Sequence, residues 1–170
     1  MTGMRLMDFI CTEAILPDLK AETARAAIDE MVEALVEAKA IPRNHQLAIV
    51  DAVMRRERKG TTGFGNGVAI PHAKHESVRG VVGLVARSAG GVEFAALDSR
   101  PVHLLFLLVS HPESPEVHLK AMEHVFRSIK NDNFRRFLLR ASSREEIVDL
   151  LREADEELKF RRASEGPRAR

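Results

Sequence analysis

Residues 61–72, TTGFGNGVAIPH, carry more structural information than any other stretch of the chain. The glycines at 63, 65 and 67 permit a tight loop whose backbone can approach other groups closely. The apolar run Val68–Ile70 predicts a short strand. Pro71 lacks an amide N–H and has a fixed φ, so we expect it to end this strand and to leave His72 at the strand end.

A histidine beside such a loop combines a nucleophilic nitrogen with nearby backbone N–H groups. Unpaired N–H groups in a glycine-rich loop suit a phosphate or another oxyanion. The residues alone equally allow a hairpin turn followed by a surface histidine. As the candidate phosphate-binding loop we take Thr62, Gly63, Gly65, Asn66 and Gly67.

Composition indicates one globular domain and excludes several kinds of partner. The formal net charge of +1 gives no overall field for nucleic acid or a membrane surface, and the absence of Trp and Tyr argues against a nucleic-acid stacking platform. The longest apolar run, Leu104 to Val109, is too short to span a bilayer. Cys11 is the single cysteine, so no disulfide forms within the chain. We therefore expect a soluble cytoplasmic protein with no stable membrane insertion.

The hydrophobic periodicity changes twice along the chain, which predicts helices, then a sheet, then helices. Apolar residues at helical spacing predict a helix over 23–39, and Asn44 is the expected N-cap of a second helix through about Glu57. Short β-rich runs follow at Val68–Ile70, Val81–Arg87, Val92–Phe94 and Val102–Val109, the last apolar on both faces as in a covered central strand. Later helices are expected over about 116–130, after a cap at Asp132, and after a capping box at Ser143 and Glu146.

The chemistry-bearing motifs leave histidine as the candidate nucleophile. The chain has no HExxH pattern, no GxSxG elbow and no Walker-type Gly-Lys-Ser/Thr, so we expect no metal site. At pH 7 about three quarters of an unperturbed imidazole is neutral and has an available lone pair. Arg56, just before the glycine loop, is the candidate cation because its guanidinium matches phosphate oxygens. We expect His45, His103, His111 and His124 to be surface or edge residues.

These residues together resemble the fructose/mannitol class of enzyme IIA domains of the bacterial phosphotransferase system. The resemblance covers about residues 6 to 155 and is strongest in the glycine-to-histidine motif with its upstream Arg-Glu pair. The matching residues are Arg56-Glu57, Thr62-Gly63-x-Gly65-x-Gly67-x-Ala69-Ile70-Pro71-His72, the Gly90-Gly91 turn with Phe94, Ala96-Leu97-Asp98, the strand Val102–Val109 and His118-Leu119.

The resemblance implies a single α/β domain with a mixed central sheet flanked by helices. We expect this domain to cover residues 1–158 and to be followed by a basic, disordered tail over residues 159–170. By the same resemblance, His72 accepts a phosphoryl group from phospho-HPr and passes it to a cysteine of an enzyme IIB domain, without a cofactor. His118 is then the second active-site histidine and Arg56 the phosphate-facing cation. The place of His118 near a helix N-terminus is expected to lower the pKa of its imidazole.

Two roles remain open for such a domain. It serves either as a phosphocarrier in sugar uptake or, as in the nitrogen-related branch, as a regulatory module whose phosphorylation state controls partner proteins. Both roles need the same site, so the site residues do not separate them. A 170-residue chain with no attached IIB, IIC or HPr domain slightly favours the regulatory role. The helix after His118 differs from the family pattern at Met122, Glu123 and His124, which leaves the partner-facing surface open.

Overall fold

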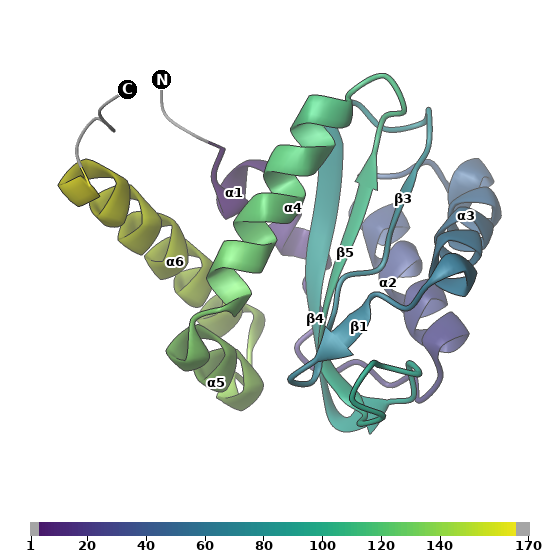
Figure 1. The fold of residues 1–170 in the computed structure, drawn as a ribbon. Helices are drawn as coiled ribbons and strands as arrows, with labels where there is room; N and C mark the ends of the chain where they lie inside the picture. The colour runs from purple at the N-terminus through teal and green to yellow at the C-terminus, as the bar shows by residue number, and fades with distance from the viewer. Residues whose placement is uncertain (1–3, 166–170) are drawn as a thin grey trace.

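The computed structural model describes residues 4–165, which form one mixed sheet with helices on both of its faces (Figure 1). This confirms the expected single layered α/β domain. In chain order the elements are α1 (Leu6–Phe9), η1 (Thr12–Ala14), α2 (Ala24–Glu37), η2 (Arg43–His45), α3 (Gln46–Lys59), β1 (Gly63–Gly65), β2 (Val68–Ala69), β3 (His72–Lys74), β4 (Val81–Val92), β5 (Val102–Ser110), α4 (Pro115–Ile129), α5 (Asp132–Arg140) and α6 (Arg144–Glu165).

Strand β5 is the centre of the sheet. On one side it pairs antiparallel with β4, and on the other side it pairs parallel with β2 and then with β3. Val68 lies opposite Leu104 and His72 lies opposite Leu108, so β2 and β3 follow one edge of β5 on either side of Pro71. The expectation that Pro71 ends the strand is therefore only half right. Proline removes one ladder donor, after which the chain returns to the same edge at His72.

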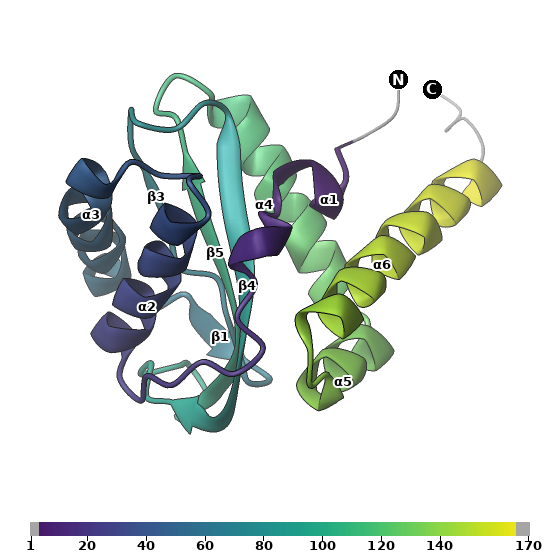
Figure 2. The same ribbon diagram turned by 180° about the vertical axis from the view of Figure 1, so that it is seen from behind.

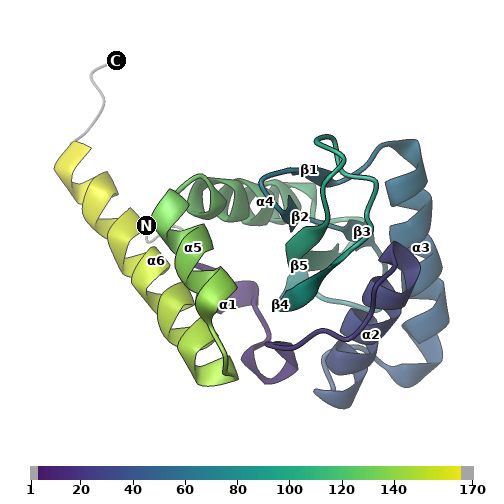
Figure 3. The ribbon, with the colours of Figure 1, turned by 90° about the horizontal axis from the view of Figure 1, so that it is seen from below.

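The two faces of β5 enter two separate hydrophobic cores. Leu105, Leu107 and Val109 pack in the core under α2 and α3, and their alternating neighbours pack in the core under α1, α4, α5 and α6. Figures 2 and 3 show these two helical layers on opposite sides of the sheet. The prediction of a central strand covered on both faces is confirmed.

The long strand β4 replaces the two strands expected at 81–87 and 92–94. Its register on β5 shifts between Arg87, opposite Leu104, and Val92, opposite Val102, so the intervening residues form a bulge. Gly91 lies in this bulge with φ +89°, where a Cβ would lie 2.7 Å from Pro101 Cβ. The glycine pair that looked like a turn between strands is thus an irregularity within one strand.

Two helix caps differ from the expectation by a residue or two. Asn44 does not cap α3, because Arg43–His45 forms a 3-10 turn that leads directly into that helix from Pro42. The side chain of Asn131, rather than Asp132, accepts the first N–H groups of α5. Ser143 behaves as expected, since its hydroxyl accepts a hydrogen bond from the Glu146 N–H.

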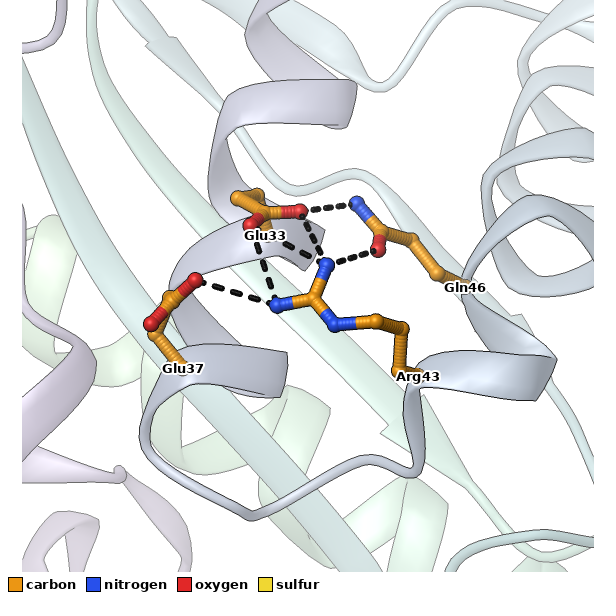
Figure 4. Close-up of polar contacts among 4 residues, drawn as sticks. All are labelled: Glu33, Glu37, Arg43 and Gln46. Atoms are coloured by element: carbon orange, nitrogen blue, oxygen red, sulfur yellow. Dashed lines mark hydrogen bonds and ion pairs between the residues drawn. The ribbon is translucent and has the colours of Figure 1, made fainter.

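Helix α3 is joined to α2 by a polar cluster around Arg43 (Figure 4). The Arg43 guanidinium contacts Glu37 at 3.0 Å and Glu33 at 3.4 Å, and Gln46 donates to Glu33. The hydrogen bond from Gln46 is the main cause that lowers the pKa of Glu33. Arg43 and Glu37 are exposed and Glu33 and Gln46 are half-buried, so the cluster adds little stability.

The last helix extends past the boundary that the sequence suggests. Helix α6 runs to Glu165, so the first part of the expected tail is helical, and residues 166–170 lie outside the described residues. None of the helices within residues 4–165 has the length and apolar content needed to cross a membrane.

Candidate functional site

His72 and His118 meet at the carboxyl end of the parallel strands. His72 begins β3 opposite Leu108, and β5 then leads through a short loop into α4, whose first turns carry His118. The two imidazole rings have centroids 5.4 Å apart and planes at 48°. In open α/β sheets this edge is where ligands bind, because loops and helix N-termini converge there. The structure therefore brings together two residues that are 46 positions apart in the sequence.

The backbone fixes the tautomer of His72. Its Nδ1 lies 2.8 Å from the carbonyl oxygen of Ile70, which can only accept, so Nδ1 carries the proton and Nε2 keeps its lone pair. The ring is half-buried, and burial lowers the pKa of His72 below its usual value. The hydrogen bond to Ile70 opposes this shift, and the charge of Arg56 adds to it. His72 is thus a neutral imidazole whose nucleophilic nitrogen is Nε2.

His118 is more deeply buried than His72 and has a different partner. Its Nδ1 lies 2.6 Å from the hydroxyl oxygen of Ser110, the last residue of β5. Burial lowers the pKa of His118 to about 4, and the charges of His72 and Lys74 act in the same direction. The expected direction of the shift agrees with this value, but its main cause is burial rather than the helix terminus. His118 is therefore neutral at physiological pH.

Arg56 and the adjacent Glu57 extend from the end of α3 and serve different groups. Arg56 Nη1 donates to the Gly60 carbonyl at 2.9 Å, and within the described residues its guanidinium makes no ion pair. Glu57 instead accepts hydrogen bonds from the Thr62 N–H at 2.7 Å and from the Thr62 hydroxyl at 2.6 Å. The carboxylate thus holds the loop, while the cation is left unneutralised near His72.

Comparison with known proteins shows the family to which this chain belongs. The family model described as "Phosphoenolpyruvate-dependent sugar phosphotransferase system, EIIA 2" matches residues 8–154. The chain belongs to this EIIA family. The resemblance found in the sequence is thereby confirmed, and the family supports a role in phosphoryl transfer.

Relatives of this EIIA chain include a fructose-specific EIIABC component and a nitrogen regulatory protein. It is 31% identical over 152 residues to the fructose-specific EIIABC component of Bacillus subtilis, and the match covers 89% of this chain and 24% of that protein. It is 31% identical over 148 residues to a nitrogen regulatory protein of Bradyrhizobium diazoefficiens, covering 87% and 95%. The solved structure of the nitrogen regulatory protein IIA-Ntr from Neisseria meningitidis superposes with a TM-score of 0.76 at 26% identity, covering 85% and 97%.

The glycine loop of this EIIA chain is a β-hairpin, and most of it lies away from His72. Asn66 and Gly67 have φ of +58° and +73°, as in the two-residue turns that favour Asn-Gly. The Gly67 carbonyl accepts the N–H groups of His103 and Leu104. Leu104 lies four positions along β5 from Leu108, the residue opposite His72. At the spacing of a strand this is about 13 Å from the position opposite His72.

The tip of the hairpin therefore does not present its N–H groups to a phosphate on His72, contrary to the sequence-based expectation for Gly65, Asn66 and Gly67. The Asn66 N–H instead donates to Asp98 at 3.3 Å. The start of the loop is closer to the site. The Thr62 carbonyl accepts the Ile70 N–H at 3.2 Å, and Gly63 pairs with Ala69.

Sequence reasoning missed two residues of the site, Lys74 and Ser110. Lys74 lies two residues after His72 on β3, hence on the same side of the strand, and its charge lowers the pKa of both histidines. If residues 72–74 had been predicted as a strand, the two-residue spacing would have placed Lys74 on the same side as His72. No local signal indicates Ser110, because its contact with His118 crosses the loop between a strand and a helix.

His124 contradicts the expectation of a surface residue. It is 6% exposed, and its Nε2 lies 3.5 Å from Oδ1 of Asp155 on α6. Helix α4 packs against α1 and α5, and Asp155 reaches His124 from α6, so this position is covered. Among residues 4–165 the structure shows no group of three or more His, Cys, Asp or Glu side chains able to hold a metal ion.

Proposed function

We propose that this chain is a phosphoryl carrier that accepts a phosphoryl group on Nε2 of His72 from the phosphohistidine of HPr. The observation that carries the proposal is the hydrogen bond from His72 Nδ1 to the Ile70 carbonyl, beside a second neutral histidine and a cation. Membership of the EIIA family supports it independently. We propose a cytoplasmic location for the chain, and the transfer needs no cofactor.

The transfer is an in-line displacement at phosphorus. The lone pair of His72 Nε2 forms the new P–N bond while the P–N bond of the donor phosphohistidine breaks, and the bonding electrons return to the donor ring. Each imidazole retains the proton on its other nitrogen, so no general base is needed. Such reactions depend on positioning and charge stabilisation, and the fixed tautomer of His72 supplies the positioning.

The cations near His72 stabilise the transferring group. Arg56 and Lys74 both act on the His72 ring electrostatically, so a phosphoryl group bound there lies within their field. A neutral His118 adds a hydrogen-bonding nitrogen without a third positive charge. This arrangement neutralises part of the phosphoryl charge and still allows the group to leave.

The surface beside the site suits a protein partner. Leu119, which follows His118 on α4, is 63% exposed, and Phe126 is 37% exposed with its ring 5.4 Å from that of Phe64. Exposed apolar and aromatic side chains of this kind are typical of protein interfaces. We infer that the acceptor in a transport role is a cysteine of an IIB domain. The B. subtilis relative, whose name joins EIIA, B and C components, supports this inference.

A regulatory role is the second candidate, supported by the nitrogen regulatory protein of which the match covers 95%. A phosphoryl group adds about −1.5 to −2 charges at neutral pH, which is enough to change an attractive docking surface into a repulsive one. In this role the phosphorylation state of His72 controls binding to a partner rather than delivery to a cysteine. A sugar permease gene beside the coding gene favours transport, and a sigma-factor or kinase gene favours regulation.

Labelling tests the carrier proposal directly. Incubation with enzyme I, HPr and phosphoenolpyruvate is expected to produce one acid-labile, base-stable phosphoryl adduct, which is absent in His72→Ala. His75→Ala is the matched control, because His75 lies beyond the strand with its ring bonded to Ser77 and is expected to label normally. Label retained in a folded His72→Ala protein would contradict the proposal.

We also propose that the EIIA unit is complete within residues 1–158 and that residues 159–170 are a dispensable tail. Phe160 is 74% exposed, which agrees with a helix end that packs on little. A chain truncated after Leu158 is expected to accept label at the same rate as the full chain. A strongly reduced rate at unchanged stability would assign a role to the tail.

A further inference from the structure

Ser110 makes a buried hydrogen bond to the second histidine of the site. It is fully buried at the end of β5, and its hydroxyl oxygen lies 2.6 Å from His118 Nδ1. His118 is itself 9% exposed, so water has little access to this contact. The bond therefore decides which nitrogen of the His118 ring carries the proton.

The direction of the bond follows from the partners that each group has. Within residues 4–165 the Ser110 hydroxyl forms no side-chain hydrogen bond other than the one to His118. If His118 Nδ1 donated, the hydroxyl proton of Ser110 would be buried without an acceptor. A buried, unsatisfied donor is costly, whereas a hydroxyl oxygen that only donates is tolerated. The hydroxyl therefore donates and His118 Nδ1 accepts.

The two histidines are thus held in opposite tautomers. His72 keeps its proton on Nδ1 because a carbonyl faces that atom, and His118 keeps its proton on Nε2 because a hydroxyl donates to its Nδ1. His72 then offers a lone pair to phosphorus, while His118 offers an N–H to a phosphoryl oxygen. The difference arises from the two partner groups, since both rings are neutral imidazoles.

We propose that Ser110 is a positioning residue that holds His118 as the Nε2–H tautomer, so that His118 donates a hydrogen bond to the phosphoryl group carried by His72. The inference rests on the proposed carrier function for its consequence, but the tautomer itself is a property of the unphosphorylated chain. Ser110 acts only through His118 and does not contact the phosphoryl group.

The tautomer is measured on the chain alone. Two-bond proton–nitrogen NMR correlations of a chain labelled with ¹⁵N in its histidines, recorded near pH 7, are expected to show His118 protonated on Nε2 and His72 protonated on Nδ1. Resonances are assigned with His118→Ala and His72→Ala. A His118 ring protonated on Nδ1 would overturn the proposal.

A double-mutant cycle tests whether the hydroxyl matters to transfer. Ser110→Ala is expected to slow phosphoryl exchange with HPr by about 2- to 10-fold at unchanged apparent affinity, the effect of losing one neutral hydrogen bond. In a His118→Ala background the same substitution is expected to have no further effect, because its action passes through the missing ring. A Ser110→Ala rate equal to wild type, or equal losses in both backgrounds, would overturn the proposal.

The control is a second buried serine outside the site. Ser128 on α4 is 4% exposed and donates to the His124 carbonyl, so Ser128→Ala removes a comparable buried hydroxyl. It is expected to leave both the His118 tautomer and the exchange rate unchanged. Failure of wild-type chain to label on His72 would overturn the carrier function, whereas the wrong tautomer in a chain that labels normally would overturn only the role of Ser110.

Discussion

Helix α4 carries two buried histidines with different roles. His118 and His124 are six residues apart and expose 9% and 6% of their surface, so burial does not distinguish them. His118 faces a neutral hydroxyl and the ring of His72, whereas His124 faces the carboxylate of Asp155. The first lies at the strand edge where a ligand can reach, and the second lies between helices.

The difference shows that the partner of a histidine, rather than its burial, indicates its role. Asp155 also accepts the N–H groups of Leu6 at 2.7 Å and Met7 at 3.1 Å, so its carboxylate joins α1, α4 and α6. Those N–H groups belong to the first turn of α1, where no intrahelical acceptor exists. We therefore expect the His124 site to stabilise the fold and the His118 site to support transfer.

The largest expected effect separates the two sites by stability. Asp155→Ala removes a buried carboxylate from its partners and is expected to lower the free energy of unfolding by about 3–5 kcal/mol. Urea denaturation measures this change, and Asp149→Ala, an exposed carboxylate on the same helix, is expected to change it by less than about 0.5 kcal/mol. Phosphorylation of His72 at a temperature where the variant is folded is expected to remain normal. An Asp155→Ala protein that is as stable as wild type but is phosphorylated slowly on His72 would contradict the separate roles of the two sites.

The pH dependence of the unfolding free energy tests the His118 site of the same comparison. Because the pKa of folded His118 is about 4 and that of an unfolded histidine is about 6.5, the unfolded chain binds more protons between these values. Stability therefore falls as the pH is lowered through this window, by up to about 1.4 kcal/mol per pH unit and about 3 kcal/mol in total.

His118→Gln removes this titration, so its unfolding free energy is expected to fall less steeply than that of wild type between pH 6.5 and pH 4. Urea titrations at several pH values measure both slopes, and titrating groups that do not interact with His118 cancel in their difference. Equal slopes would mean that folded His118 titrates normally.

The smallest of the three effects concerns Arg56. A charge-assisted hydrogen bond contributes about 1.5–3 kcal/mol, so Arg56→Ala is expected to slow transfer to His72 by about 10- to 150-fold with little change in melting temperature. Arg56→Lys is expected to recover part of the rate, because it keeps the charge and loses the planar fork. Arg55→Ala, on the exposed side of the same helix, is the control. Normal transfer with a large loss of stability would make Arg56 a structural residue.

Much of the fold and part of the site could be predicted from the sequence. The apolar strand β5, the helical periodicity of α2 and the glycine-to-histidine motif are local signals, and they located the sheet centre, His72 and Arg56 as candidates. The sequence did not predict the bulge in β4 or the pairing of β3 with β5 after Pro71. Glycine and proline mark irregular backbone but do not show which strand they interrupt.

The contacts that define the chemistry could not be predicted in the same way. The carbonyl of Ile70 has no sequence signature, and the contacts of Ser110 and Asp155 depend on how distant elements pack. His124 was misjudged for the same reason, since it is buried by distant elements that pack on α4 and contacts Asp155 on α6, not its neighbours in sequence. The glycine loop was misjudged because positive φ in an Asn-Gly turn serves a hairpin as well as an anion site.

The nitrogen that carries the phosphoryl group tests the central claim most directly. If the Ile70 carbonyl holds the Nδ1 proton of His72, phosphorus must bond to Nε2 of that ring. Phosphorus–nitrogen couplings in the NMR spectrum of the chain, labelled with ¹⁵N in its histidines and phosphorylated by HPr, are expected to show a single adduct at His72 Nε2. An adduct on His72 Nδ1, or on His118, would contradict the account.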